Sequence, residues 1–149
     1  MVQSYQLQLG NLLFNKERNS ELCEVCSLHR YGTSSIEVSE HDSGYVYTTQ
    51  IDHLDPIPLT QEILLKMGFV LIKTAIITRT MQISLGRDRY LSVACAGTPN
   101  EAVYISEEEA PVVKDIICLR NYDYDGKTYV HDIQNLYQDI TKKPLIFPL

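Results

Sequence analysis

The sequence predicts an α+β fold, with an antiparallel-rich sheet of about seven or eight strands and two helices. Short runs that alternate apolar and polar residues, such as 81–85, have the period of half-buried strands. Turn residues separate these runs at close intervals, which favours hairpins over the long crossovers of a parallel sheet. Apolar residues recur at helical spacing in two stretches, one within 55–69 and one over 129–141.

The N-terminal third is expected to consist of strands. Tyr5, Leu7 and Leu9 alternate with glutamines, and Gly10-Asn11 then shifts the phase, as a β-bulge would. Strands are predicted over 5–14, 21–30, 36–38 and 45–51. Residues 52–59 are expected to form a loop that leads into the first helix.

The first helix carries start and stop signals at both ends. Thr60 is a suitable N-cap, because its hydroxyl can accept a hydrogen bond from an amide of the first turn. Leu59 can pack on Leu64 as a hydrophobic staple. Gly68 can adopt the left-handed conformation that ends a helix. We therefore predict a short helix that is scaffold and carries no chemistry.

Strands are expected again after this helix. They are predicted over 69–77, 81–85, 89–96, 102–105 and 112–122, with a hairpin turn at 86–88 and a turn at Asp125-Gly126. A second helix is predicted from about Tyr129 to Thr141. The tail 144–148 is expected to form an edge strand or to pack over the core. With 149 residues and no linker, residues 1–149 are predicted to form a single domain.

Composition and charge exclude several classes of function. The net charge is −6 and no basic stripe is present, so a protein that binds duplex nucleic acid is not expected. No apolar run approaches the length of a membrane span, and the N-terminus lacks the features of a signal peptide. We expect a cytoplasmic protein with reduced cysteines, no membrane partner and no cofactor.

The residues that could hold a metal or act as acid and base are scattered. Cys23 and Cys26 form a C-x-x-C, but they lie in a predicted strand, where positions three apart face opposite sides. No metal site is therefore expected. Asp52 and Asp55 flank His53, either as solvated loop charges, which we favour, or as a general acid/base pair.

Arginine and tyrosine side chains are the best candidates for a binding site. The chain has ten tyrosines and no tryptophan. Arginine binds phosphate through a bidentate fork, and tyrosine offers a flat face for stacking on a base. We predict Arg87, Arg89 and Tyr90 as ligand-binding residues, together with His131 and Asn135 of the second helix. Cross-strand pairing of surface residues is the alternative at each position.

Two stretches carry a resemblance to a known family. They are Ile57–Phe69, which reads IPLTQEILLKMGF, and Tyr129–Tyr137, which reads YVHDIQNLY. With Leu9-Gly10-Asn11 they resemble a family of small proteins of Bacteroidetes bacteria, their phages and mobile elements. Lys142-Lys143-Pro144 departs from the family's usual ending. The resemblance implies no activity, but it implies an accessory protein of phage type, which would act in the host cytoplasm.

The expected function combines this context with the residues. We expect a counter-defence protein that binds and sequesters a small anionic ligand, such as a nucleotide immune signal, without catalysis. Symmetric copies can share a charged ligand, so a homo-oligomer is expected. The alternative is a protein–protein interaction module that blocks a host or phage protein. A weaker alternative is a small hydrolase built from scattered His and Asp residues.

Overall fold

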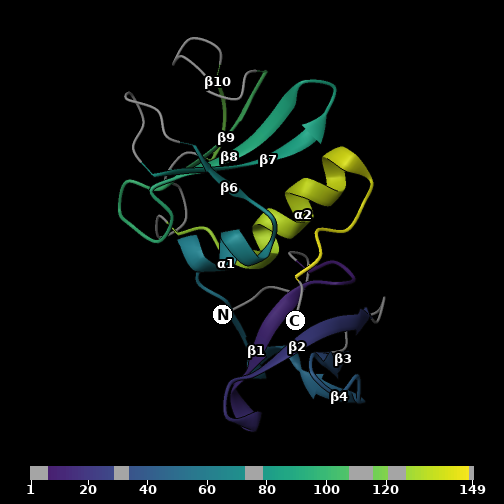
Figure 1. Cartoon of the computed structure of the whole chain (residues 1–149). Helices are drawn as coiled ribbons and strands as arrows, with labels where there is room; N and C mark the ends of the chain where they lie inside the picture. Colours follow the sequence, from purple (N-terminus) through teal and green to yellow (C-terminus); the bar gives the residue numbers. More distant parts are fainter. Residues whose placement is uncertain (1–6, 29–33, 73–78, 108–115, 121–126, 148–149) are drawn as a thin grey trace. The chain divides into compact units, whose positions relative to one another are not determined.

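A computed structural model describes residues 7–28, 34–72, 79–107, 116–120 and 127–147 of the chain (Figure 1). The predicted α+β class is confirmed, and the described residues form ten strands, more than the seven or eight expected. The chain divides into two compact units. We call Met1–Ile57 with Tyr129–Leu136 the first unit, and Pro58–Thr128 with Tyr137–Pro148 the second unit. The single domain stays a prediction, because contacts alone do not decide whether two units unfold cooperatively.

The first unit contains a five-stranded antiparallel sheet with the order β4-β3-β2-β1-β5. Its strands are β1 (Leu12–Asn15), β2 (Glu21–Ser27), β3 (Ser35–Glu40), β4 (Val46–Gln50) and β5 (Leu54–Pro56). Two 3₁₀ turns, η2 (Lys16–Arg18) and η3 (Ile51–His53), connect β1 to β2 and β4 to β5. The first four strands therefore form a meander, and β5 returns to pair with β1.

This sheet is strongly curled. The Nδ2 of Asn15 on β1 donates to Tyr47 Oη at 3.0 Å and reaches Thr49 Oγ1 at 3.5 Å on β4. In a flat sheet, strands with two others between them are about 14 Å apart, so these contacts require curvature. The curl encloses a core of apolar side chains: Leu7, Leu13, Cys23, Val25, Ile36, Val38 and Leu54.

The second unit contains another five-stranded antiparallel sheet, with the order β10-β9-β8-β7-β6. Its strands are β6 (Val70–Ile72), β7 (Thr80–Gly86), β8 (Arg89–Ala94), β9 (Ala102–Ser106) and β10 (Ile116–Arg120). The helix α1 (Gln61–Lys66) contacts β6 and β7 (Figure 1). A Cβ built on Gly68, just beyond α1, would lie 3.9 Å from the Ile83 side chain. The end of α1 therefore approaches the face of the sheet that carries Ile83.

The capping signals of the first helix are confirmed. Thr60 Oγ1 accepts a hydrogen bond from Ile63 N at 3.2 Å. Gly68 has φ +89°, and the Phe69 amide donates to the Leu64 carbonyl at 3.0 Å, which closes the helix end. Leu64 is fully buried. This side chain anchors α1 in the core of the second unit.

The second helix, α2 (Val130–Thr141), begins within one residue of its predicted start. Its first part docks on the curled sheet through an amide side chain. Gln134 Oε1 accepts from Leu12 N at 2.9 Å, and Gln134 Nε2 donates to the Gly10 carbonyl at 3.1 Å. One side chain thus hydrogen-bonds to the backbone beside β1 much as a neighbouring strand would.

Some expected boundaries differ from the observed ones. The loop expected over 52–59 contains η3 and the short strand β5, which forms because β1 offers it a backbone partner. The strand expected over 5–14 is regular only from Leu12. No strand occurs in the described tail residues 144–147. The turn at Asp125-Gly126 lies outside the described residues. Within the described chain, neither helix has the length and apolar character to cross a membrane.

Candidate functional site

The predicted arginines lie at the turn of the β7–β8 hairpin. Arg87 and Asp88 have φ values of +53° and +56°, the left-handed conformation that tight hairpin turns require. Arg87 and Arg89 are exposed. Among the described residues, neither guanidinium group has a hydrogen-bond or ion-pair partner. Both groups are therefore available to an anion from solution.

The hairpin does not bring all three predicted residues to one face of the sheet. Arg89 pairs with Gly86, and Tyr90 pairs with Ser84. Since successive residues of a strand point to opposite faces, Arg89 and Tyr90 project from different faces. Arg87 lies at the tip, where its long side chain is not restricted to either face. A ligand at the turn can meet both arginines, whereas Tyr90 flanks one face only.

The two residues predicted on α2 have structural contacts in the first unit. His131 is buried, stacks on the Tyr129 ring with centroids 5.9 Å apart, and places Nε2 3.6 Å from Asp132 Oδ1. Asn135 Oδ1 accepts a hydrogen bond from Asn11 Nδ2 at 2.7 Å. The hairpin belongs to the second unit, so the two groups are described separately. A ligand-binding role for His131 and Asn135 stays a prediction.

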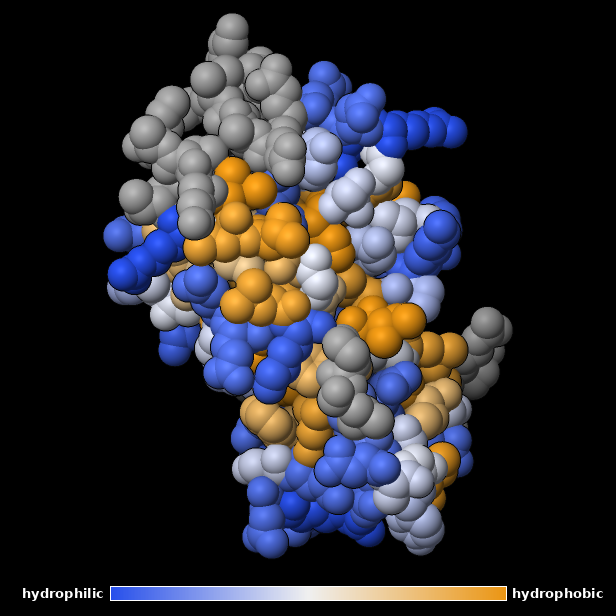
Figure 2. Space-filling view, in the orientation of Figure 1, coloured by the Kyte–Doolittle hydropathy of each residue, from blue (hydrophilic) through white to orange (hydrophobic). Residues whose placement is uncertain are grey.

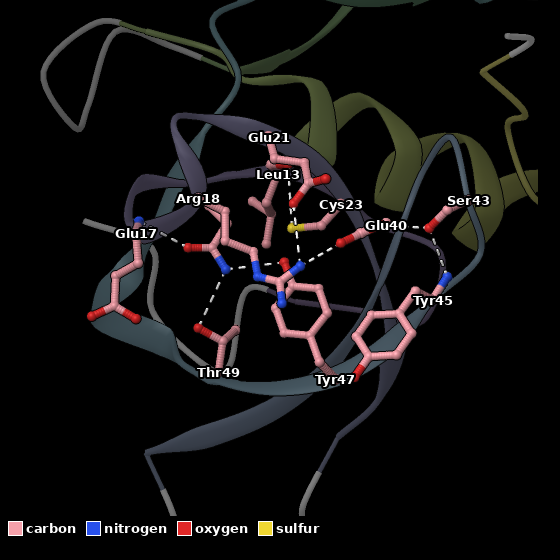
Figure 3. Close-up of polar contacts among 11 residues, drawn as sticks. Leu13, Glu17, Arg18, Glu21, Cys23, Glu40, Ser43, Tyr45, Tyr47 and Thr49 are labelled. Atoms are coloured by element: carbon pink, nitrogen blue, oxygen red, sulfur yellow. Dashed lines mark hydrogen bonds and ion pairs between the residues drawn. The ribbon is translucent and has the colours of Figure 1, made fainter.

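A cluster that the sequence did not single out occupies one surface of the first unit (Figure 3). We call it the Arg18 cluster, and it comprises Arg18, Tyr45, Tyr47, Glu21 and Glu40. The guanidinium carbon lies 3.9 Å from the Tyr47 ring centroid and 5.9 Å from that of Tyr45. The two rings stack with centroids 6.2 Å apart. Arg18 also forms ion pairs with Glu40 and, at 3.6 Å, with Glu21.

The electrostatics of the Arg18 cluster do not favour an anion. One guanidinium group faces two carboxylates, so the charged groups sum to −1 at neutral pH, and an incoming phosphate would compete with both. Desolvation raises the pKa of Tyr47, and the hydrogen bond from Asn15 opposes this shift. The contacts of Arg18 therefore stabilise the position of η2 against the neighbouring strands. Tyr45, 59% exposed, leaves its outer ring face open.

The residues of the possible acid/base pair around His53 contact other charged side chains. Its Nδ1 lies 3.0 Å from Glu17 Oε2 without hydrogen-bond geometry, and its Nε2 lies 3.6 Å from Asp52 Oδ1. Asp55 instead pairs with Lys16 at 3.4 Å. Both imidazole nitrogens face carboxylates, which leaves neither directed at a substrate. This arrangement suits a surface ion-pair network better than a catalytic pair.

The two cysteines of the C-x-x-C face opposite sides of β2, as expected from strand geometry. Cys23 is fully buried and its thiol donates to the Leu13 carbonyl at 3.5 Å, whereas Cys26 is exposed. Burial, with a smaller contribution from Glu21, raises the pKa of Cys23 to about 12. Cys23 is therefore a protonated core residue at neutral pH. A search of the described residues finds no group of three or more His, Cys, Asp or Glu that could hold a metal.

No family model, curated protein or solved structure matches the chain. The resemblance to the Bacteroidetes and phage family therefore stays a prediction. The function has to be argued from the contacts and charges of the residues themselves.

Proposed function

We propose that the protein binds and sequesters a small anionic ligand, such as a nucleotide immune signal, at the β7–β8 hairpin. The observation that carries this proposal is the pair of exposed guanidinium groups of Arg87 and Arg89, for which the described chain supplies no partner. The chain as a whole carries an excess of negative charge, with a net charge of −6. The turn is thus a local cationic site, with two arginines against the single carboxylate of Asp88.

The chemistry of these groups suits a phosphate. A guanidinium group presents parallel N–H donors that match two phosphate oxygens, and the bond is charge-assisted. Two such groups separated by one residue can hold one phosphoryl group or two linked ones. The proposal includes a homo-oligomer, in which copies of the turn would come together and share one ligand.

Sequestration is preferred to conversion of the ligand because Arg87, Arg89 and Tyr90 at the turn are groups that bind a ligand rather than groups that catalyse its conversion. A hydrolase built around His53 and Asp52 is less favoured, since carboxylates already face both ring nitrogens. The proposed role in phage counter-defence rests on the sequence resemblance alone.

One observation favours the alternative, a protein–protein interaction module. Strand β4 is at the edge of its sheet, carries no charged residue and contains no proline. Val46 at its start is 53% exposed, and Tyr45 directly before it is 59% exposed. Folded proteins commonly protect such edges with charges, prolines or bulges, so an unprotected edge is suited to pair with a strand of another protein.

Calorimetric titration with a panel of nucleotides tests the proposal. Arg87→Ala and Arg89→Ala should each weaken binding by about 1.5–3 kcal/mol, the scale of a hydrogen bond to a charged group. Arg87→Lys keeps the charge but loses the bidentate fork, so it should bind with intermediate affinity. Lys66→Ala is the matched control, because it removes an exposed positive charge from α1 of the same unit.

The fate of the ligand separates the three functions. Intact nucleotide recovered after heat denaturation supports sequestration, and a chemically altered nucleotide supports the hydrolase. Retention of no nucleotide, with capture of a protein partner through β4, supports the interaction module. Wild-type affinity in both arginine-to-alanine variants would remove the hairpin from the site.

A further inference from the structure

Hydrogen bonds at the two ends of β4 show which of its backbone groups point away from β3. Before the strand, Glu40 N donates to the Tyr45 carbonyl at 2.9 Å, and after it Ile51 N donates to the Ser34 carbonyl at 2.7 Å. Hydrogen-bonded and non-hydrogen-bonded pairs alternate along an antiparallel ladder. Both ends therefore agree that the odd-numbered residues of β4 bond to β3. The even-numbered residues direct their N–H and C=O groups out of the sheet.

The outward-directed groups at the start and centre of β4 are open. Val46 and Thr48 are exposed, and within the described chain no hydrogen bond reaches the backbone of either residue. The side chains of Tyr47 and Thr49 instead contact Asn15, on the inner face of the curled sheet. The Arg18 cluster uses the same inner face, so its contacts leave the edge accessible.

The opposite edge of the same sheet carries the protection that β4 lacks. Strand β5 contains Asp55 and Pro56, and Asp55 forms an ion pair with Lys16 at 3.4 Å. A charge and a proline on an edge strand oppose pairing with another chain. Strand β4 reads Val-Tyr-Thr-Thr-Gln and has neither. The two edges of one sheet thus differ in whether they accept a further strand.

The edge of β4 is complementary to itself. In an antiparallel pair with a two-fold axis at Thr48, this residue meets Thr48 of a second copy, and Val46 meets Gln50 of that copy. All of these residues direct their backbone groups outward, so each meeting forms a hydrogen-bonded pair. This register also pairs the whole of β4, Val46–Gln50, with the same strand of the second copy.

Charge does not oppose this pairing. A two-fold axis brings identical residues together, so a charged strand would repel itself, but β4 has no charged residue. The acidic residue paired with Thr48 on β3 is Glu37. Glu37 and its copy would be three strand spacings apart, about 14 Å. This separation exceeds the screening length of about 8 Å at physiological salt, and a Thr–Thr pair across strands is favourable.

We propose that a second copy of this chain occupies the edge of β4, so that two five-stranded sheets join into one continuous sheet across a two-fold axis at Thr48. The inference specifies the interface of the proposed homo-oligomer, and it does not depend on the ligand at the β7–β8 hairpin. The strand pair is smaller than a standard interface of about 20–30 residues a side. The dimer is therefore expected to dissociate at micromolar concentrations.

Sedimentation velocity of the full chain, from about 5 to 500 μM, measures the dimer. Thr48→Lys places two like charges at the axis, so it should raise the dissociation constant at least about tenfold. Apolar side chains are also exposed on the second unit (Figure 2), where Leu65 of α1 is 51% exposed. Leu65→Lys is the matched control, because it adds the same charge there and should leave the dimer unchanged.

Cysteine cross-linking tests the register. The variants carry Cys26→Ser as well, because Cys26 is exposed. Residues of a hydrogen-bonded antiparallel pair have Cα atoms about 5.5 Å apart, within the range of a disulfide, so Thr48→Cys should cross-link two copies under mild oxidation. The two Val46 residues of the dimer would be about 14 Å apart. Val46→Cys should therefore remain uncross-linked on a non-reducing gel.

Four results would overturn the inference. They are a wild-type protein that is monomeric at about 500 μM, a dimer unchanged in Thr48→Lys, a dimer lost in Leu65→Lys alone, and cross-linking of Val46→Cys without Thr48→Cys. A monomer that captures another protein through β4 would favour the interaction module instead. Because these measurements use no ligand, failure of the β4 dimer and failure of the hairpin site are distinguishable.

Discussion

Replacement of Gln134 by Ala should destabilise the protein strongly, although the side chain is neither apolar nor charged. The change removes the acceptor of the buried Leu12 amide and the donor to the Gly10 carbonyl. A buried amide left without a partner costs about 1–3 kcal/mol, and loss of the second bond adds about 1 kcal/mol. We expect the free energy of unfolding to fall by about 2–4 kcal/mol, which lowers the midpoint of a urea titration by about 1–2 M.

Gln138→Ala is the control for this experiment. It makes the same substitution on the same helix at a half-buried position, so the change in helix propensity is equal in the two variants. Unfolding of both proteins in urea, followed by circular dichroism, measures the difference. Equal stability of the two variants, within about 0.5 kcal/mol, would refute the idea that Gln134 substitutes for a strand partner.

Three further perturbations test the structure. Leu64→Ala should lower the free energy of unfolding by about 2–5 kcal/mol because it opens a cavity in the core, whereas Leu65→Ala, at a half-exposed position of α1, should have little effect in the same denaturation assay. Burial raises the pKa of the Cys23 thiol from about 9 in the unfolded chain to about 12 in the folded protein, so its contribution to stability should be lost as pH rises above about 9. In thermal melts from pH 8 to 11, Cys23→Ala should therefore lose stability less steeply with pH than the wild type. An unchanged dependence of stability on pH in this variant would contradict the raised pKa. Gly97→Ala should destabilise by about 1–3 kcal/mol, because its Cβ would lie 2.9 Å from a backbone oxygen. Gly86→Ala has a similar positive φ but open space around it, so equal melting temperatures for the two glycine variants would argue against the clash.

The sequence determined those features of the fold that depend on neighbours in the chain. A helix cap joins groups within a few residues, so Thr60 and Gly68 marked the ends of α1 correctly. Alternation within a run identified most strands and predicted that Cys23 and Cys26 face opposite sides of one of them. Residues 86–88 were recognised as a hairpin turn for the same reason, since the flanking runs pair in register.

The candidate binding residues were only partly accessible to this kind of reasoning. The sequence located Arg87 and Arg89 at a turn, but it could not show that their guanidinium groups lack partners, because that depends on the surrounding surface. Helical spacing placed the second helix, but it could not show what the polar side chains of that helix contact. The structure shows that Gln134 bonds to the backbone around β1, which lies 122 residues away in the chain.

Tertiary structure alone decided which distant residues meet. Strand β5 was expected as a loop because three residues carry no periodicity, and it exists only because the curled sheet presents β1 to it. Arg18 joins Glu40 and Tyr47 through the pairing of β2, β3 and β4, although nothing near Arg18 in sequence predicts those partners. Local hydrogen bonds and side-chain periodicity are set by near neighbours and can be read from the chain. Contacts across a sheet depend on register and curvature, which the whole set of strands fixes together.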